Sequence, residues 1–389
     1  MKPTVRVAFM IGSDGSSWTG GSNYLSNVLG AIAQLDDRRI ETVLFVPPEA
    51  DDALLTRFPA DHIVRSTIVK PRSPLRLAGK VLERMTGRNH VMEAVLRRHH
   101  VDVLSHVAPL GPRSTARVLS WIPDFQERHL PDFFAADEVA RRETGYRAIV
   151  AGATRIILSS EDARADLATL YPQAVDKARV LRFVAMTKGT TDDRSGHVAD
   201  TYGVDGPYFY LPNQFWIHKN HAVVVAALAI LKARGVPATV IATGSTNDYR
   251  HPDFFDRFRQ SVVDAGVEDR FRIAGLVPFE DVGALARHSV ALINPSLFEG
   301  WSTTVEEAKS AGKRILLSDI PVHREQAPER GAYFGPHDAA ALADLMTRTI
   351  ADHDLAEERR HAAAAAADLP ARIQAFASTY QSIVLDAVA

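Results

Sequence analysis

Two glutamates eight positions apart, Glu299 and Glu307, enclose a short run of glycine, tryptophan and hydroxyl residues. Carboxylates accept hydrogen bonds from sugar hydroxyl groups, which are donors that need fixed acceptors. If a helix begins between the two glutamates, its free backbone N–H groups and its positive dipole end can bind an anion such as a diphosphate. The pattern predicts a site for a sugar nucleotide. A capped helix with two solvated glutamates is the alternative interpretation.

The elements around this segment can be predicted from the same residues. The apolar run Val290–Ile293, closed by Asn-Pro, is typical of a buried parallel strand that ends at a loop. A helix is expected to begin near Ser302, because the following threonines and glutamates have capping-box spacing, and to end at Gly312. Glu299 then lies in the loop, and Glu307 projects from the first helical turn.

A second candidate is Lys219, which follows a predicted strand over Tyr208–Leu211. We expect Asn220 to cap the next helix, so that a phosphate near Lys219 can meet both an ammonium group and free N–H groups. A solvated lysine is the alternative, although a cation at a helix start is slightly unfavourable. His218 and His221 could mimic a metal pair, but no further ligands are evident, so we expect no metal.

Length and composition limit the class of protein. At 389 residues the chain exceeds one typical core, which predicts two domains. A net charge of -2 argues against nucleic acid as a partner, and the lack of cysteine excludes disulfides, thiolate metal sites and a cysteine nucleophile. The first apolar run, Val5–Ile11, is too short for a signal peptide, and no window of about 18 apolar residues occurs. We therefore expect a soluble cytoplasmic protein.

Apolar runs alternate with amphipathic ones along both halves, which predicts an α/β fold with parallel sheets. We expect an N-terminal domain over residues 1–187, a polar linker over 188–203, a C-terminal domain over 204–370 and a last helix over 371–389 that packs back on the first domain. The two domains would be Rossmann-like and would face each other across a cleft that holds the ligand. The expected strands are Val5–Ile11, Glu41–Val46, Val101–Ser105, Arg117–Ile122, Arg155–Ser159, Tyr208–Leu211, Thr239–Thr243, Phe271–Ala274, Val290–Ile293 and Arg314–Ser318.

These motifs resemble those of the retaining glycosyltransferases of family 4, which have the GT-B fold. The resemblance covers nearly the whole chain, and its most specific part is the Glu299-x7-Glu307 segment. The other parts are Gly20-Gly21, the run from Leu211 to His221, and the turn Ala274-Gly-Leu-Val277.

The resemblance implies roles for particular residues. Lys219 would pair with the donor diphosphate, and the Gly20-Gly21 loop would lie over the phosphates. The family usually places an arginine five residues before that lysine, where this chain has Gln214, and a His-Asp pair where this chain has Pro123-Asp124. The implied catalytic residues are Lys219, Glu299 and Asp124. The implied donor-binding residues are Gly20, Gly21, Gln214, Lys219, Gly244, Glu299, Gly300, Ser302, Thr303, Thr304 and Glu307.

The implied reaction moves a hexosyl unit from GDP-mannose or a UDP-hexose to a saccharide or lipid-linked saccharide, with retention of configuration and without metal or cofactor. Between Arg57 and Arg98 basic residues outnumber acidic ones, and apolar residues accompany them after Ser73. Such a segment could contact an anionic membrane at its inner face, or be an ordinary surface helix. A nucleotide-sugar epimerase of the same fold, or a non-catalytic nucleotide-sugar-binding subunit, are the alternatives from other classes.

Overall fold

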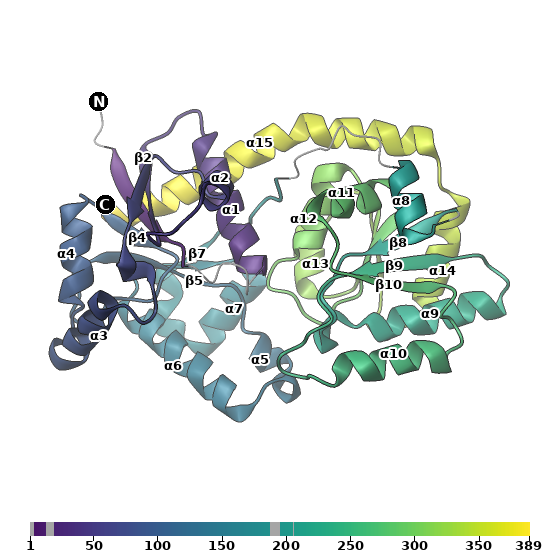
Figure 1. The fold of residues 1–389 in the computed structure, drawn as a ribbon, viewed down its shortest axis with the longest axis horizontal. Coiled ribbons are helices and arrows are strands. Elements are labelled where there is room, and N and C mark those ends of the chain that lie inside the picture. The colour runs from purple at the N-terminus through teal and green to yellow at the C-terminus, as the bar shows by residue number, and fades with distance from the viewer. Residues whose placement is uncertain (1–3, 13–18, 187–194, 205) are drawn as a thin grey trace. The chain divides into compact units, whose positions relative to one another are not determined.

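The computed structural model describes residues 4–12, 19–186, 195–204 and 206–389. The chain forms two compact units (Figure 1). Unit 1 comprises Met1–Phe125, Ala136–Val184 and Pro370–Ala389, and unit 2 comprises Gln126–Ala135 and Ala185–Leu369. The short segment Gln126–Ala135 therefore belongs with unit 2, although residues 1–187 were expected to form one domain.

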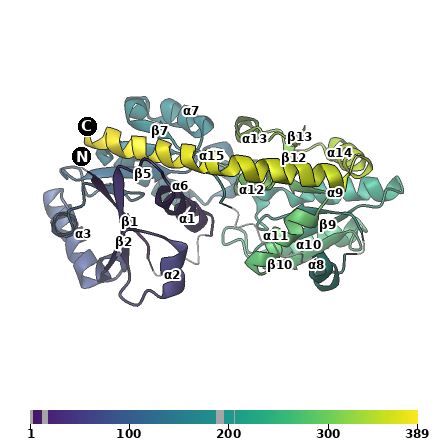
Figure 2. The same ribbon diagram turned by 90° about the horizontal axis from the view of Figure 1, so that it is seen from above.

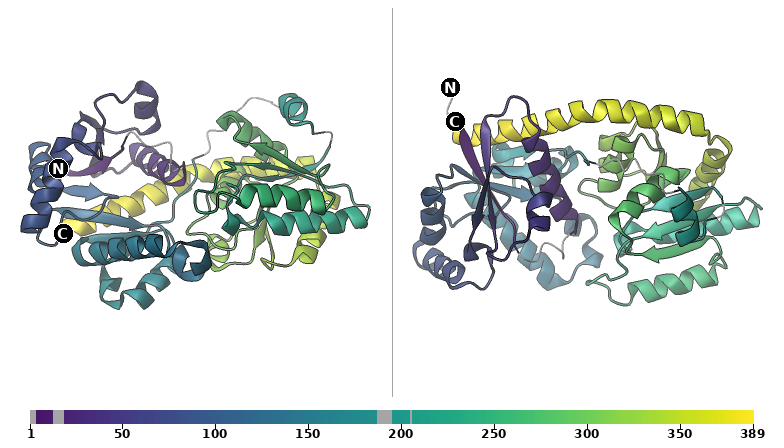
Figure 3. Two further views of the ribbon diagram at one scale, coloured as in Figure 1. Left: turned by 60° about the horizontal axis from the view of Figure 1, so that its bottom comes forward. Right: turned by 45° about the horizontal axis from the view of Figure 1, so that its top comes forward.

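Unit 1 is built on a seven-stranded parallel sheet with helices on both faces (Figures 1 and 3). The strand order is β3-β2-β1-β4-β5-β6-β7. All five strands predicted for this half are confirmed, and the sequence analysis missed only the two edge strands, β3 and β7. The strands are β1 (Val5–Met10), β2 (Ile40–Val46), β3 (His62–Arg65), β4 (Val103–Ser105), β5 (Arg117–Ile122), β6 (Arg155–Leu158) and β7 (Ala178–Val180).

Unit 2 holds a six-stranded parallel sheet in the order β10-β9-β8-β11-β12-β13. Its five predicted strands are confirmed, and the edge strand β13 was missed. The strands are β8 (Tyr208–Leu211), β9 (Thr239–Thr243), β10 (Phe271–Gly275), β11 (Ala291–Asn294), β12 (Ile315–Ser318) and β13 (Gly331–Phe334). The strands are apolar without alternation, because helices cover both faces of the sheet.

The helices of unit 1 are α1 (Thr19–Ala33), α2 (Asp52–Arg57), α3 (Pro74–Thr86), α4 (His90–Arg98), α6 (Ala136–Gly152) and α7 (Glu161–Leu170). Those of unit 2 are α5 (Gln126–His129), α8 (Ser195–Tyr202), α9 (His221–Ala233), α10 (Phe254–Asp264), α11 (Phe279–His288), α12 (Thr303–Ala311), α13 (Pro321–Gln326) and α14 (Ala339–Ala351). Helix α8 occupies part of the expected linker 188–203, and residues 187–194 lie outside the described part. No helix in the described ranges is long and apolar enough to cross a membrane.

The last helix, α15 (Leu355–Val388), is much longer than expected (Figure 2). We expected it to begin near residue 371, but it begins at Leu355 and contains Pro370 in its interior. Its residues from Pro370 onward belong to unit 1. There the Asp386 carboxylate pairs with Arg155 and Arg179, which lie at the starts of β6 and β7.

Candidate functional site

The candidate site of unit 2 lies where its chain changes direction across the sheet. Strands β8 and β11 are parallel neighbours in the middle of the sheet, with β9 beyond one and β12 beyond the other. Ligands of open α/β sheets bind outside the carboxyl ends of strands at such a switch point. Lys219 follows β8, and Glu299 follows β11, so the topology alone brings these two predicted residues to the same edge.

Lys219 and Glu299 form an ion pair, with 2.6 Å between Nζ and Oε1. Their side chains are 15% and 10% exposed, so the pair is largely shielded from solvent. Burial by itself raises the pKa of Glu299, but the charge of Lys219 and a hydrogen bond from Ser296 Oγ outweigh it and hold the pKa at about 2. Glu299 is therefore a fixed anion at neutral pH that orients the ammonium group.

Two asparagines that the sequence analysis did not select connect this pair to the helix α12. Asn294, the last residue of β11, donates from Nδ2 to Ser302 Oγ over 2.7 Å. Asn213 donates from Nδ2 to Asn294 Oδ1 and accepts from Thr304 Oγ1. Both side chains are at least 96% buried, which makes these bonds strong determinants of loop geometry. The sequence could have indicated both asparagines, because each is a polar residue at or just after the end of an apolar strand.

Helix α12 begins as predicted, but its cap differs from the prediction. Ser302 is the N-cap, and its Oγ accepts from Val305 N at 3.3 Å. The expected capping boxes are wrong, because Glu306 turns into the interior and accepts from Gln326 Nε2 and Lys309 Nζ. The predicted C-cap is confirmed, since Gly312 has a φ of 64°.

Glu307 differs from Glu299 in its surroundings. It is the fifth residue of α12, beyond the first turn where we expected it, and its side chain is half-buried. Within the described residues its carboxyl group has no hydrogen bond, and burial raises its pKa to about 7. A carboxyl group one turn into a helix, with no hydrogen bond to any described residue, is a candidate ligand-binding group, because structural carboxylates are normally paired.

Gln214 and Gly244 lie together. Gln214 Oε1 accepts from Ser245 N at 3.0 Å, so the side chain fixes the turn that follows β9. Gly244 has a φ of 139°, and a Cβ there would lie 2.5 Å from Asn213 O. Only glycine fits this close approach. At the position where an arginine was expected by resemblance, Gln214 brings no charge and instead positions a backbone turn.

The prediction that Asn220 caps α9 is wrong in its chemistry. Asn220 precedes the helix, but its side chain makes no cap bond and instead donates to the carbonyl groups of Pro295 and Pro336. It therefore ties the β8 loop to the β11 loop. Burial lowers the pKa of both His218 and His221 to about 3, so both are neutral. No group of potential metal ligands occurs among the described residues.

A third histidine, His323 of α13, was not found from the sequence. It is fully buried, and its Nδ1 bonds to Ser318 O at 2.9 Å. Burial lowers its pKa, while the charge of Glu299 acts in the opposite direction. Its Nε2 has no hydrogen-bond partner among the described residues. The ring therefore adds a neutral polar group beside the Lys219–Glu299 pair.

In unit 1 the predicted glycines lie inside a helix. Gly20 and Gly21 are the second and third residues of α1, and not part of a loop before it as expected. Their N–H groups still belong to the first turn, which has no partners within the helix. The buried Ser22 Oγ beside them has no partner in the part of the chain that is described. Among the described residues, this helix start therefore presents an unpaired hydroxyl group beside the N–H groups of its first turn.

Asp124 also belongs to unit 1, two residues after the end of β5, and it is half-buried. Its carbonyl group accepts from Tyr146 OH at 3.4 Å. Lys219, Glu299 and Glu307 belong to unit 2. The structure therefore pairs Lys219 with Glu299, places Glu307 on the helix that follows Glu299, and places Asp124 at the carboxyl edge of the other sheet.

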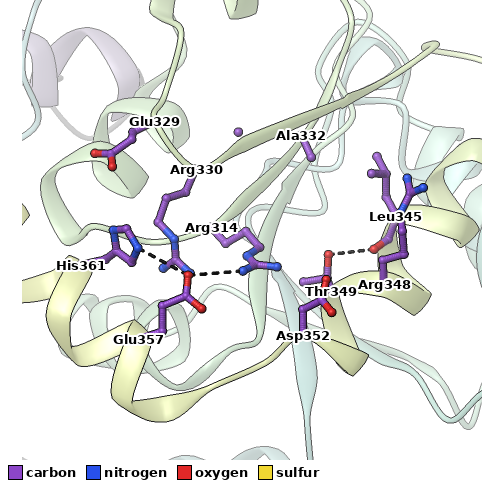
Figure 4. Close-up of a pocket in the computed structure, with 11 residues that line it drawn as sticks. Arg314, Glu329, Arg330, Ala332, Leu345, Arg348, Thr349, Asp352, Glu357 and His361 are labelled. Atoms are coloured by element: carbon purple, nitrogen blue, oxygen red, sulfur yellow. Dashed lines mark hydrogen bonds and ion pairs between the residues drawn. The ribbon is translucent and has the colours of Figure 1, made fainter.

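A cavity of about 420 Å³ lies at the other edge of the unit 2 sheet (Figure 4). Arg314 and Arg330 line it from the residues just before β12 and β13. Glu357 of α15 lies 3.9 Å and 3.7 Å from these two guanidinium groups and 3.5 Å from His361. The charges in this cavity largely neutralise one another. They anchor α15 to the sheet, at the edge opposite Lys219.

The geometry defines an α/β protein with two parallel sheets. Comparisons with known proteins identify the fold more closely. Residues 203–368 match the family model described as glycosyl transferases group 1. The crystal structure of a glycosyltransferase from Rickettsia africae ESF-5 has a TM-score of 0.69 and 14% identity, covering 98% of this chain and 99% of that chain. The chain therefore has the predicted GT-B fold, and its residues 203–368 are similar to the group 1 glycosyl transferases.

Two curated proteins are similar in sequence. The O-antigen chain mannosyltransferase RfbU of Salmonella typhimurium is 27% identical over 132 residues, which are 34% of this chain and 35% of RfbU. The lipopolysaccharide core biosynthesis mannosyltransferase LpcC of Rhizobium leguminosarum bv. viciae is 27% identical over 195 residues, which are 43% of this chain and 54% of LpcC. The matched regions thus span about a third to a half of these relatives.

Proposed function

We propose that the protein is a retaining, metal-independent hexosyltransferase that uses a nucleotide diphosphate sugar. One observation carries this proposal: Lys219 pairs with Glu299 at the switch point of a parallel sheet, directly before the helix α12 that bears Glu307. An ammonium group and the free N–H groups of a helix start suit a diphosphate. Glu307, whose carboxyl group has no hydrogen bond with a described residue, suits a hydroxyl of the sugar or ribose.

In the proposed reaction the bond between the sugar C1 and the diphosphate oxygen breaks, and the acceptor oxygen bonds to C1 on the same face. The acceptor proton passes to the departing diphosphate. Lys219, Gly21 and the Ser302–Thr304 helix start stabilise the charge that develops on this leaving group. Glu299 holds Lys219 in place, and Asp124 orients the acceptor.

The donor we propose is GDP-mannose or a UDP-hexose, and the names of the two curated relatives favour a mannosyl group. The acceptor is a saccharide or lipid-linked saccharide used in cell-surface polysaccharide or glycoconjugate synthesis. We also propose that the protein works in the cytoplasm and contacts the inner face of the membrane through the segment 57–98.

A thermal-shift panel of UDP, GDP, ADP, dTDP and CDP tests the donor site. One diphosphate should stabilise the protein, and Glu307→Ala should remove the effect. Lys219→Ala is a poor control, because it leaves Glu299 buried without its partner. The double substitution Lys219→Met with Glu299→Gln removes both charges and keeps the volume. Stabilisation by none of the five diphosphates would refute the proposal, and formation of an isomeric sugar without acceptor would indicate an epimerase.

A further inference from the structure

The helix α3 of unit 1 is oriented with its apolar side toward solvent. Leu77, Val81 and Met85 follow one another at intervals of four residues, and their side chains are 49%, 55% and 77% exposed. Residues at this spacing lie on one face of a helix. A helix at a protein surface normally turns such a stripe toward the core, so this orientation needs a separate explanation.

The face of α3 that packs on the protein is small and polar. Gly79 is buried, and a Cβ there would lie 2.5 Å from Asn89 Oδ1. Glu83 accepts from Asn89 Nδ2 at 3.2 Å, and Arg76 donates to Val69 O at 3.1 Å. These contacts fix the rotation of α3 beside α4, at the outer edge of unit 1 (Figures 1 and 2). The apolar stripe cannot turn inward without breaking them.

Cations accompany this stripe. Lys80 and Arg84 are exposed, lie next to the stripe on the helix, and have no hydrogen bond or ion pair with any described residue. Arg72, just before the helix, has none either. By contrast, Arg65 bonds to the carbonyl groups of Pro48 and Ala50, and Arg88 pairs with Glu93. Of the cations in the segment 57–98 that have no side-chain bond with a described residue, Arg72, Lys80 and Arg84 lie at or on α3, and Arg97 and Arg98 lie at the end of α4.

We propose that α3 lies on an anionic lipid bilayer, with Leu77, Val81 and Met85 inserted among the acyl chains and Lys80 and Arg84 at the phosphates. Charge complementarity selects this partner, because an apolar stripe flanked by unpaired cations is the pattern of helices that bind at membrane interfaces. A second copy of the chain would bring like charges together. A bilayer at α3 is where the enzyme would meet a lipid-linked acceptor. This link to the acceptor rests on the proposed function, whereas binding of α3 to the bilayer does not.

The test is co-sedimentation of the full chain with vesicles. The protein should bind vesicles of phosphatidylcholine with 30% phosphatidylglycerol, bind phosphatidylcholine alone weakly, and detach as salt is raised. Lys80→Glu with Arg84→Glu should weaken binding by at least about 30-fold, since each cation near such a surface contributes about a fivefold effect and two are lost. Leu77→Gln with Val81→Gln and Met85→Gln should weaken it at least about tenfold.

Charge reversal elsewhere provides the matched control. Arg257 and Arg259 are exposed on α10 of unit 2, and Arg257→Glu with Arg259→Glu should leave vesicle binding unchanged. Unbound wild-type protein, or unaltered binding by the α3 variants, would overturn the inference. Light scattering would show a dimer if the stripe binds a second copy of the chain. A wild-type dimer that does not bind vesicles, together with a monomeric Leu77→Gln, Val81→Gln, Met85→Gln variant, would also overturn the inference. Nucleotide thermal shifts on the same variants separate these outcomes from failure of the donor site.

Discussion

Replacing Glu307 by glutamine should change stability in a way that depends strongly on pH. The pKa of Glu307 rises from 4.5 to about 7 because the carboxyl group is removed from solvent. This difference of about 2.5 pH units corresponds to about 3 kcal/mol, at about 1.36 kcal/mol per unit. The folded state then binds a proton that the unfolded state releases, so wild-type stability falls as pH rises from about 4.5 to 7. Glutamine is neutral throughout and avoids this loss.

The assay is thermal unfolding of wild type and Glu307→Gln at pH 5 and pH 8. The two proteins should melt at similar temperatures at pH 5, where most of the loss is absent. At pH 8 the variant should melt about 6 to 12 °C higher, since about 1 kcal/mol shifts the midpoint of a unit of this size by about 2 to 4 °C. Glu280→Gln, at an exposed site on α11, should show no such difference. A gain for Glu307→Gln that is equal at both pH values would refute the reasoning about burial.

Other predictions concern the same unit. Lys219→Met should cost about 3 kcal/mol in the free energy of unfolding because it strands a buried Glu299, and Glu299→Gln in the same protein should restore most of it, as urea unfolding can show. Because the pKa of Glu299 is lowered to about 2, its contribution is present above pH 4.5 and lost as pH falls toward 2. When the free energy of unfolding is measured as the pH is lowered, Glu299→Gln should lack this loss of stability between pH 4.5 and 2. Gly244→Ala should destabilise more than Gly206→Ala, since both have φ near 140° but only Gly244 meets a backbone atom, Asn213 O.

The central strands could be predicted from the sequence because they are buried on both faces and read as apolar runs. The edge strand β3 was missed, since its four residues, His62–Arg65, are mostly exposed and include polar side chains. The last helix was expected to begin at residue 371, although α15 begins at Leu355 and continues through Pro370. The local sequence was sufficient to predict strands that are buried on both faces, because burial restricts them to apolar residues. It was insufficient for the strands at the edges of the sheets and for a helix that continues through a proline.

The residues of the candidate site could likewise be predicted only in part from the local sequence. Lys219 and Glu299 could be placed together because both follow central strands of one parallel sheet. The partners of Asn220 could not be predicted, because its side chain bonds to Pro295 and Pro336, which lie far along the chain. His323 was likewise invisible, since nothing in its local sequence indicates that α13 turns it toward Glu299. Long-range hydrogen bonds have no local signature.

Unit 1 is assembled from both ends of the chain, and this affects the order in which the two units can fold during synthesis. Tyr380 of α15 donates to Ser105 Oγ at 2.8 Å, and Gln381 binds the backbone around Arg39. These partners leave the ribosome some 275 and 342 residues before the helix that joins them. Unit 2, apart from Gln126–Ala135, is continuous, so it can fold during synthesis while unit 1 still lacks one of its helices. The unit whose strands are translated first is therefore the last to be completed, and until then the apolar surface that α15 covers is exposed.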